Sequence, residues 1–248
     1  MENNTQIYGI RAIIEALQAD KPVDKIFIQK GLRGDLSREL ETLIRHKGIG
    51  VSYVPVEKLN RLSKNNHQGV IATISPISFY SLEELVENAI AHKEKPLFLL
   101  LDQLSDVRNF GAVIRTAECT GVDGIIIQKK GGAPVTADTI KTSAGAVFKV
   151  PIAKVDHLKD AVFYLQASGI KVIAASEKTN NTIYSVSFNE PCAIIMGAED
   201  TGISPSILKV VDATAKLPLM GKIGSLNVSV ACGVFLYEVV RQRMIVDG

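Results

Sequence analysis

Short apolar segments alternate along this chain with segments in which apolar residues recur at helical spacing. The apolar runs of the C-terminal part, such as 97–101 and 194–196, lack polar alternation, as is typical of strands that are covered on both faces. Strands that alternate with helices in this way predict an α/β fold with a parallel sheet flanked by helices. The predicted strands are 96–102, 124–128, 148–153, 170–176, 193–197 and 213–219, and the predicted helices are 109–119, 137–141, 157–167 and 227–243.

The N-terminal third predicts a smaller α/β unit of its own. Its helices are expected at 10–17, 36–47 and 56–62, and its strands at 25–29, 50–54 and 69–74. A helix with Ser81 as N-cap and Glu84 three residues later, the spacing of a capping box, then leads into the second part. We therefore expect three segments: a domain at 1–75, a linker and connecting helix at 76–95, and a larger domain at 96–248.

Composition narrows the class of protein. A chain of 248 residues with 46% hydrophobic and 22% charged residues is globular and long enough for a sizeable core. The start lacks the layout of a secretory signal and no long apolar run is present, so we expect a cytoplasmic protein that does not enter a membrane. The three cysteines are widely spaced in apolar segments, which favours buried thiols over disulfides or a zinc site.

Charge is almost balanced, with a formal net charge of +2. Residues 1–75 hold 11 Lys and Arg against 8 Asp and Glu, whereas residues 76–248 hold 17 against 18, so the excess lies in the N-terminal third. This distribution is a weak indication of where a polyanion docks, and an ordinary solvated surface explains it equally well.

The loops that follow strands carry the candidate chemistry, because ligands of open parallel sheets bind beyond the carboxyl ends of the strands. After the strand at 96–102, Asn109 is a plausible helix N-cap, Gly111 and Ala112 allow a close approach of backbone, and Arg115 projects from the same helix. An amide and a guanidinium near one helix start could hold a phosphate or a ribose. An N-cap and a surface arginine are the alternative.

Two further loops are polar or rich in glycine. The loop after 193–197 places Glu199 between Gly197 and Gly202, where the carboxylate could orient a hydroxyl or pair with Arg115. The loop after 213–219 ends in Ser225-Leu226-Asn227, a polar start to an almost wholly apolar helix. Either loop alone could be a solvated turn.

Several familiar motifs are missing from the sequence. There is no phosphate-binding loop with its Lys-Ser/Thr, no dinucleotide fingerprint after a strand, no HExxH or Cys/His spacing and no GxSxG elbow. Nucleotide triphosphates, nicotinamide cofactors, metal-dependent chemistry and common hydrolase mechanisms are therefore disfavoured, and we expect no metal site.

Three ordered segments of the chain resemble the three motifs of the SpoU/TrmH branch of the SPOUT RNA methyltransferases. They are NFGAVIRTA at 109–117, IMGAEDTGI at 195–203, and 217–231 with LPL at its start and SLNVSVA at its end. In addition, YGIRAIIEAL and HQGVIA resemble the beginning and end of the substrate-binding module found in family members that methylate guanosine ribose in 23S rRNA. Nearly the whole chain is covered by the resemblance.

The resemblance implies an enzyme that transfers a methyl group from S-adenosylmethionine to a ribose 2′-hydroxyl of RNA, with a guanosine of 23S rRNA as the expected target. It also implies a C-terminal trefoil knot and a homodimer whose active site borrows residues across the interface. The methyl donor would be contacted in the knot, largely through backbone, and the residues expected there are Gly197, Leu217 and Leu226, with Ala175, Met196, Ile203 and Met220 as neighbours.

The family pattern further places a set of polar residues around the methyl group and the ribose, namely Asn109, Arg115, Glu199, Ser225 and Asn227. We expect Arg115 to bind the adjacent phosphate and stabilise the developing alkoxide, because a guanidinium is effectively always protonated. Phosphate, water or Glu199 would then assist deprotonation. The chain departs from the common wording of the second motif at Asp200-Thr201, which adds a charge beside the site.

Two other functions remain open at the level of sequence. A tRNA 2′-O-methyltransferase would share the three motifs, although such enzymes tend to lack this N-terminal module. A non-catalytic RNA-binding protein of ribosome assembly would keep the fold but not need the polar residues of all three loops.

Overall fold

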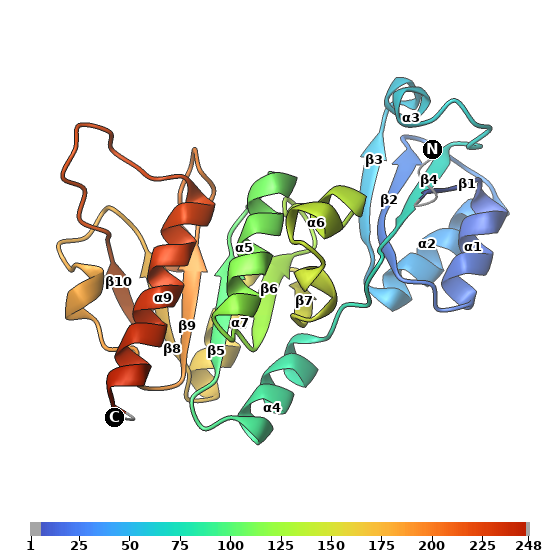
Figure 1. The fold of residues 1–248 in the computed structure, drawn as a ribbon. Helices are drawn as coiled ribbons and strands as arrows, with labels where there is room; N and C mark the ends of the chain where they lie inside the picture. The colour runs from blue at the N-terminus through green and yellow to red at the C-terminus, as the bar shows by residue number, and fades with distance from the viewer. Residues whose placement is uncertain (1–5, 247–248) are drawn as a thin grey trace. The chain divides into compact units, whose positions relative to one another are not determined.

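The computed structural model describes residues 6–246 and forms two compact units (Figure 1). The first contains the chain up to Ser78 together with Pro134–Thr136, and the second contains Phe79–Ala133 and the chain from Ala137. Residues 1–5 of the predicted first domain lie outside the described residues, as do the last two residues of the chain.

A four-stranded sheet with the order β1-β4-β2-β3 forms the first unit. The strands β2 and β3 are parallel, whereas β4 runs antiparallel to both β1 and β2. One face packs against α1 and α2 through a core that includes Leu17, Ile26 and Leu40, and the other face carries α3 with Leu59. The elements are β1 Gln6–Tyr8, α1 Ile10–Gln18, β2 Val23–Gln29, α2 Asp35–Lys47, β3 Gly50–Val54, α3 Val56–Leu62 and β4 Val70–Ile74.

A six-stranded, fully parallel sheet with the order β10-β8-β9-β5-β6-β7 forms the second unit. Its strands are β5 Leu97–Leu101, β6 Gly124–Gln128, β7 Ile152–Val155, β8 Lys171–Ala175, β9 Cys192–Met196 and β10 Ala213–Ala215. Its helices are α4 Leu82–His92, α5 Val107–Cys119, α6 Ala137–Thr142, α7 Leu158–Ala167, α8 Pro205–Leu208 and α9 Val228–Val246. The predicted parallel sheet with flanking helices is confirmed.

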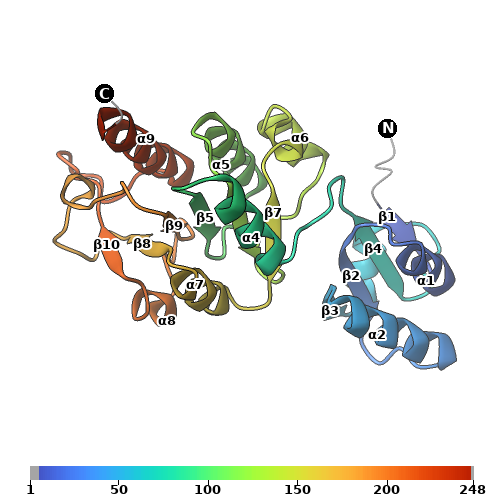
Figure 2. The ribbon, with the colours of Figure 1, turned by 90° about the horizontal axis from the view of Figure 1, so that it is seen from below.

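The helices of the second unit cover both faces of its sheet (Figure 2). Helices α4, α7 and α8 enclose the larger apolar core on one face, while α5 packs against both α6 and α9 on the other. All five residues of β5 and all five of β9 are buried, which is why these strands lack polar alternation. The capping box of Ser81 and Glu84 forms as predicted at the start of α4.

Close packing requires glycine on the α5 side. A Cβ on Gly111 would collide with the side chain of Thr142 at the end of α6, so the expected close approach at Gly111 is made by a neighbouring helix. Near the C-terminal end of α9, the Arg243 guanidinium donates three hydrogen bonds to backbone carbonyls. The acceptors are Lys95 at 2.7 Å, Phe188 at 3.1 Å and Glu190 at 3.1 Å. These bonds fix the end of α9 at the amino edge of the sheet.

Two predicted strands need correction, and two short elements were not predicted. The strand predicted at 148–153 is β7 at 152–155, preceded by a 3₁₀ turn at 146–148, since Pro151 has no N–H to donate to a sheet ladder. The short strand β1 and the four-residue helix α8 were not predicted, because segments of three or four residues carry no readable periodicity. The last predicted strand, 213–219, ends already at Ala215.

The strand order places a switch point between β5 and β9. From β5 the chain continues to β6 and β7 on one side, whereas β9, β8 and β10 lie on the other side. Ligands of open α/β sheets bind at such a point, outside the carboxyl ends of the strands. The loops that follow β5 and β9 therefore meet where a site is expected.

Candidate active site

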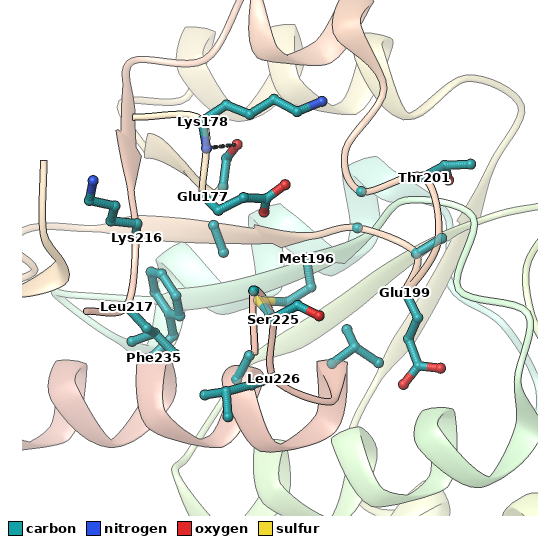
Figure 3. A pocket seen from close by; sticks show the side chains of 18 of the residues that line it. Glu177, Lys178, Met196, Glu199, Thr201, Lys216, Leu217, Ser225, Leu226 and Phe235 are labelled. Atoms are coloured by element: carbon teal, nitrogen blue, oxygen red, sulfur yellow. Dashed lines mark hydrogen bonds between the residues drawn. The ribbon is translucent and has the colours of Figure 1, made fainter. Parts of the chain in front are cut away.

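A pocket of about 330 Å³ lies beyond the carboxyl ends of β8, β9 and β10 (Figure 3). Its apolar lining comes from Met196, Leu217, Leu226 and, on α9, Phe235. The loop after β8 adds charged side chains to the lining, as does the end of β10, and these are Glu177, Lys178 and Lys216. A concave site that combines apolar walls with charged groups suits a small-molecule ligand that has both apolar and polar parts.

The loop from Gly197 to Ile203 forms one wall of this pocket as a tight hairpin. The N–H of Ala198 donates to the Gly202 carbonyl at 3.2 Å, and the Gly202 N–H donates to the Ala198 carbonyl at 2.9 Å. A Cβ on Gly197 would overlap the backbone of Gly202 and Ile203, whereas Gly202 needs its freedom for a φ of 67°. Close packing therefore requires glycine at 197, whereas the backbone conformation requires it at 202.

Three polar residues from three separate parts of the chain form a cluster next to the pocket. Glu199 Oε1 accepts hydrogen bonds from Asn109 Nδ2 at 3.0 Å and from Asn227 Nδ2 at 2.7 Å. The two amides also interact with each other, since Asn227 Nδ2 donates to Asn109 Oδ1 at 3.0 Å. We call Asn109, Glu199 and Asn227 the amide–carboxylate cluster.

The start of α5 places Asn109 for this contact, but not as predicted. Asp106 is the N-cap of α5, and its Oδ1 accepts from the Asn109 N–H at 2.8 Å. The expectation that Asn109 caps the helix is therefore wrong. Because Asp106 satisfies the helix start, the side chain of Asn109 in the first turn is free to reach Glu199.

Asn227 connects the cluster to the start of α9. Its Oδ1 accepts from the N–H of Ser229 at 3.0 Å and from the N–H of Val230 at 3.4 Å, and also from the Ser229 hydroxyl at 2.6 Å. A side-chain oxygen that accepts from N–H groups two and three residues later satisfies the first free donors of a helix. One side chain thus caps α9 and holds Glu199.

The remaining predicted catalytic residues lie apart from the cluster. Ser225 lines the pocket, and Leu226 separates it from Asn227 in the sequence. Arg115 is exposed on α5 and, within residues 6–246, makes no hydrogen bond or ion pair. Glu199 is bound by the two asparagines instead of by Arg115, so the pairing of Glu199 with Arg115 is not formed within this part of the chain.

The residues predicted to contact a cofactor divide into two groups. Five of them line the pocket, and these are Ala175, Met196, Gly197, Leu217 and Leu226. Ile203 is 5% exposed and packs into the core behind the loop, and Met220 is 97% exposed in the segment before α9.

Sequence reasoning missed the charged pocket residues Glu177, Lys178 and Lys216 and the aromatic Phe235. The signal for Glu177 was present, because it follows a buried strand whose carboxyl end lies at the same sheet edge as Gly197. Phe235 lies four and seven positions after the pocket residues Ala231 and Val228, which is the spacing of one helix face.

The two buried thiols of the second unit are poor nucleophiles. Burial raises the pKa of Cys192 to about 11 and that of Cys232 to about 12, so both are thiols at neutral pH. Among the described residues no group of three or more His, Cys, Asp and Glu side chains is arranged to hold a metal ion. Nor is any helix within residues 6–246 long and apolar enough to cross a membrane.

Comparison with known proteins identifies the family of both parts of the chain. Residues 96–237 match the SpoU rRNA methylase family, and residues 6–80 match the family described as RNA 2′-O ribose methyltransferase substrate binding. The chain belongs to the SpoU rRNA methylase family. It is accordingly an RNA methyltransferase, as its resemblance predicted.

Two relatives show how far the similarity extends. The chain is 32% identical to the putative TrmH family tRNA/rRNA methyltransferase YacO of Bacillus subtilis, over 98% of this chain and 97% of that protein. It is 34% identical to the 23S rRNA (guanosine-2′-O-)-methyltransferase RlmB of Vibrio cholerae, over 98% of each.

Solved structures share the fold. The SpoU methyltransferase AviRb from Streptomyces viridochromogenes, in complex with the cofactor AdoMet, superposes with a TM-score of 0.60 at 24% identity, covering 97% of this chain and 90% of that one. The AdoMet-bound rRNA methyltransferase from Sinorhizobium meliloti gives 0.61 at 23% identity, covering 96% of this chain and 87% of that one.

Proposed function

We propose that this protein transfers a methyl group from S-adenosylmethionine to the ribose 2′-hydroxyl of a guanosine in 23S rRNA. The observation that carries the proposal is that one loop contributes to both the pocket and the amide–carboxylate cluster. Gly197 and Glu199 line the pocket, and Glu199 is also a member of the cluster. A donor in the pocket and a hydroxyl at the cluster would then be neighbours. The similarity to RlmB of Vibrio cholerae supports 23S rRNA as the substrate.

The pocket residues fit the methyl donor chemically. The flat adenine suits the apolar surfaces of Met196, Leu217 and Leu226, whose loops also offer backbone N–H and C=O groups. Glu177 would accept from hydroxyl or ammonium groups of the donor, and Lys216 would face a carboxylate. When bound, the donor supplies a methyl group on a positively charged sulfur.

The chain itself must position and deprotonate the hydroxyl, which is a poor nucleophile while it keeps its proton. Asn109 and Asn227 occupy Oε1 of Glu199, so Oε2 of this exposed carboxylate is open to a substrate hydroxyl. We assign to Glu199 the acceptance of that hydrogen bond and then of the hydroxyl proton, and to Arg115 the binding of the neighbouring phosphate and the developing alkoxide. Ser225 would hydrogen-bond an edge of the donor or the substrate.

The larger organisation of the enzyme follows the resemblance. We propose that 1–75 binds RNA, that 76–95 connects, and that 96–248 carries the transferase with a trefoil knot, a feature that stays a prediction. We also propose a homodimer. It is supported by an exposed apolar stripe on α9, where Val230 is 53%, Val234 39% and Tyr237 57% exposed at helical spacing.

Two measurements test the function. Ribose methylation is mapped in 23S rRNA and in tRNA from cells with and without the protein, and the purified protein is then given each RNA with tritiated S-adenosylmethionine. We expect one guanosine of 23S rRNA to lose its methyl group in cells without the protein and to be methylated in the purified reaction. Methylation confined to tRNA would overturn the choice of substrate, and a methylated base would overturn the choice of acceptor.

Substitutions test the roles. Glu199→Gln should lower kcat by about 100-fold or more while the donor still binds, because the amide keeps one oxygen for the two asparagines but cannot take a proton. Arg115→Lys should also lower kcat, since an ammonium cannot replace a planar fork toward phosphate. Full activity of either variant would contradict the role assigned to that residue.

The dimer has its own test. Val234→Glu would place a charge in the apolar stripe of α9 and should yield a monomer by light scattering, whereas Phe163→Glu, an exposed apolar residue on α7, should leave the association state unchanged. A wild-type protein that is monomeric at micromolar concentration would overturn the proposal.

A further inference from the structure

Asp102 is a buried carboxylate that neither the motifs nor the pocket accounts for. It follows the last residue of β5 directly and is 0% exposed. Its place is the switch point of the sheet, between the strand orders that run toward β7 and toward β10. A charged side chain without exposure is rare unless it has a specific partner.

Both ends of the hairpin loop that carries Glu199 are bound to this one residue. The Asp102 N–H donates to the carbonyl of Met196, the residue before the loop, at 2.9 Å. Oδ2 of Asp102 accepts from the N–H of Ser204, the residue after the loop, at 2.6 Å. Asp102 thereby fixes both ends of the loop 197–203 at the end of β5. We call these two hydrogen bonds the clasp.

The neighbouring residue reinforces the clasp at a cost in backbone strain. Gln103 has a φ of 57°, a left-handed conformation that is unfavourable for a non-glycine residue. In this conformation its Nε2 donates to the Ser204 hydroxyl at 3.3 Å. Two successive residues thus hold Ser204. Asp102 binds the backbone N–H of Ser204, and Gln103 binds its hydroxyl.

The second carboxylate oxygen of Asp102 takes no part in holding the loop. Within the part of the chain that the structure describes, Oδ1 is buried and has no hydrogen-bond partner. Leaving such a group without a partner is unfavourable, and more so when it is charged. An apolar residue at this position would avoid the cost but could not hold Ser204.

We propose that Asp102 is a positioning residue for methyl transfer. It acts through the loop 197–203, which it fixes at both ends, and so sets the place of Gly197 in the donor pocket and of Glu199 in the amide–carboxylate cluster. The proposal rests on the proposed function for its catalytic consequence, but its effect on donor binding does not depend on which RNA is the substrate.

A matched control is available at the other end of the same strand. Asp123 is also largely buried, with 13% of its side chain exposed, and its Oδ2 accepts from the N–H of Leu97, the first residue of β5, at 2.9 Å. It therefore makes the same kind of bond at the amino edge of the sheet, away from the pocket. Loss of this bond should lower stability without moving the loop.

The test compares full-length Asp102→Ala, Asp102→Asn and Asp123→Ala with the wild type. Dissociation of S-adenosylmethionine is measured by calorimetry, transfer to 23S rRNA from cells lacking the protein by tritium incorporation, and stability by thermal unfolding. Asp102→Ala should weaken donor binding at least 10-fold and lower kcat/KM at least 100-fold. Asp102→Asn, which keeps an acceptor for Ser204, should stay within about threefold of the wild type, as a positioning role requires.

Ser204→Pro removes the donor of the same bond from the other side. The φ of Ser204 is −54°, which proline accepts, and the proline Cδ would take the place of the amide hydrogen, so this variant removes the bond and also crowds Asp102 Oδ2. If the bond transmits the effect, Asp102→Ala combined with Ser204→Pro should be no worse than Ser204→Pro alone, which already lacks this bond and the hydroxyl that Gln103 contacts. Additive losses would overturn the clasp, as would an Asp102→Ala protein that binds the donor like the wild type.

Two further outcomes are decisive. If Asp102→Ala proves too unstable to study, the proposal stands on Asp102→Asn and Ser204→Pro, and an Asn variant that fails to bind the donor would overturn it. If the wild type binds the donor but methylates no RNA, the proposed function fails while the donor titrations still decide the role of Asp102.

Discussion

Gly197→Ala adds one methyl group at the place where the loop leaves no room for it. The new Cβ would lie 2.5 Å from the carbonyl oxygen of Gly202, and closer still to the Gly202 carbonyl carbon and the Ile203 nitrogen. Because non-bonded carbon contacts have their optimum near about 3.5–4.0 Å, the two sides of the hairpin must separate by roughly 1 Å. All three obstructing atoms are backbone, so a rotamer change cannot relieve the overlap.

A displacement of this size is large for an active site. A misplacement of about 1 Å costs on the order of 100-fold in rate, equivalent to about 2.7 kcal/mol of transition-state stabilisation. The same loop lines the pocket, so donor affinity should fall as well. Overpacking of this kind should lower the free energy of unfolding by about 1–3 kcal/mol.

The measurement compares Gly197→Ala with Gly202→Ala. A Cβ on Gly202 meets nothing within 4 Å, so its cost is the strain of a φ of 67°, about 1–2 kcal/mol, with no need for the loop to open. Calorimetric titration with S-adenosylmethionine, tritium transfer to RNA and thermal unfolding are recorded for both. The reasoning is refuted if Gly197→Ala keeps donor affinity and kcat/KM within threefold of the wild type, or if Gly202→Ala loses more of either.

Three further predictions concern the cap of α5, the end of α9 and the burial of the cysteines. Asp106→Ala removes the N-cap of α5 and should lower the free energy of unfolding by about 1 kcal/mol in urea titration, and an unchanged midpoint would contradict the capping role. Arg243→Lys should cost about 2 kcal/mol in the same assay, because an ammonium cannot reach three backbone carbonyls as the guanidinium does. In alkylation at pH 8 followed by mass spectrometry, exposed Cys119 should react first. Cys232 should stay protected, since burial raises its pKa to about 12 and thiolate forms only as the pH approaches that value, so equal labelling would refute its burial.

The sequence predicted the sheet class and the three loops well because both depend on local pattern. Unbroken apolar strands such as 97–101 identify a sheet covered on both faces, and polar residues directly after such strands lie at its carboxyl edge. Asn109, Glu199 and Asn227 were predicted to belong to one site, and they do contact one another within this chain.

Roles within the site were harder to predict from pattern. Asp106 and Asn109 are both good N-cap residues, three positions apart, and only the backbone decides that Asp106 caps α5. Asp102 looked like the polar end of a strand, because nothing local marks an acceptor that faces a loop about 100 positions later. The alignment of β5 with β9 creates this contact, and strand order is not a local property.

The site is therefore built around one short loop that has no freedom of its own. Gly197 admits no side chain, Asp102 holds both ends, and the two asparagines fix Glu199 through one oxygen. Each restraint comes from a different part of the chain: β5, α5 and the start of α9. A loop restrained from three sides can hold a donor and a hydroxyl at a fixed separation, which is the condition under which positioning supplies most of the rate. On this view the strained backbone at Gln103 and the unpartnered oxygen of Asp102 are costs of keeping the loop in place.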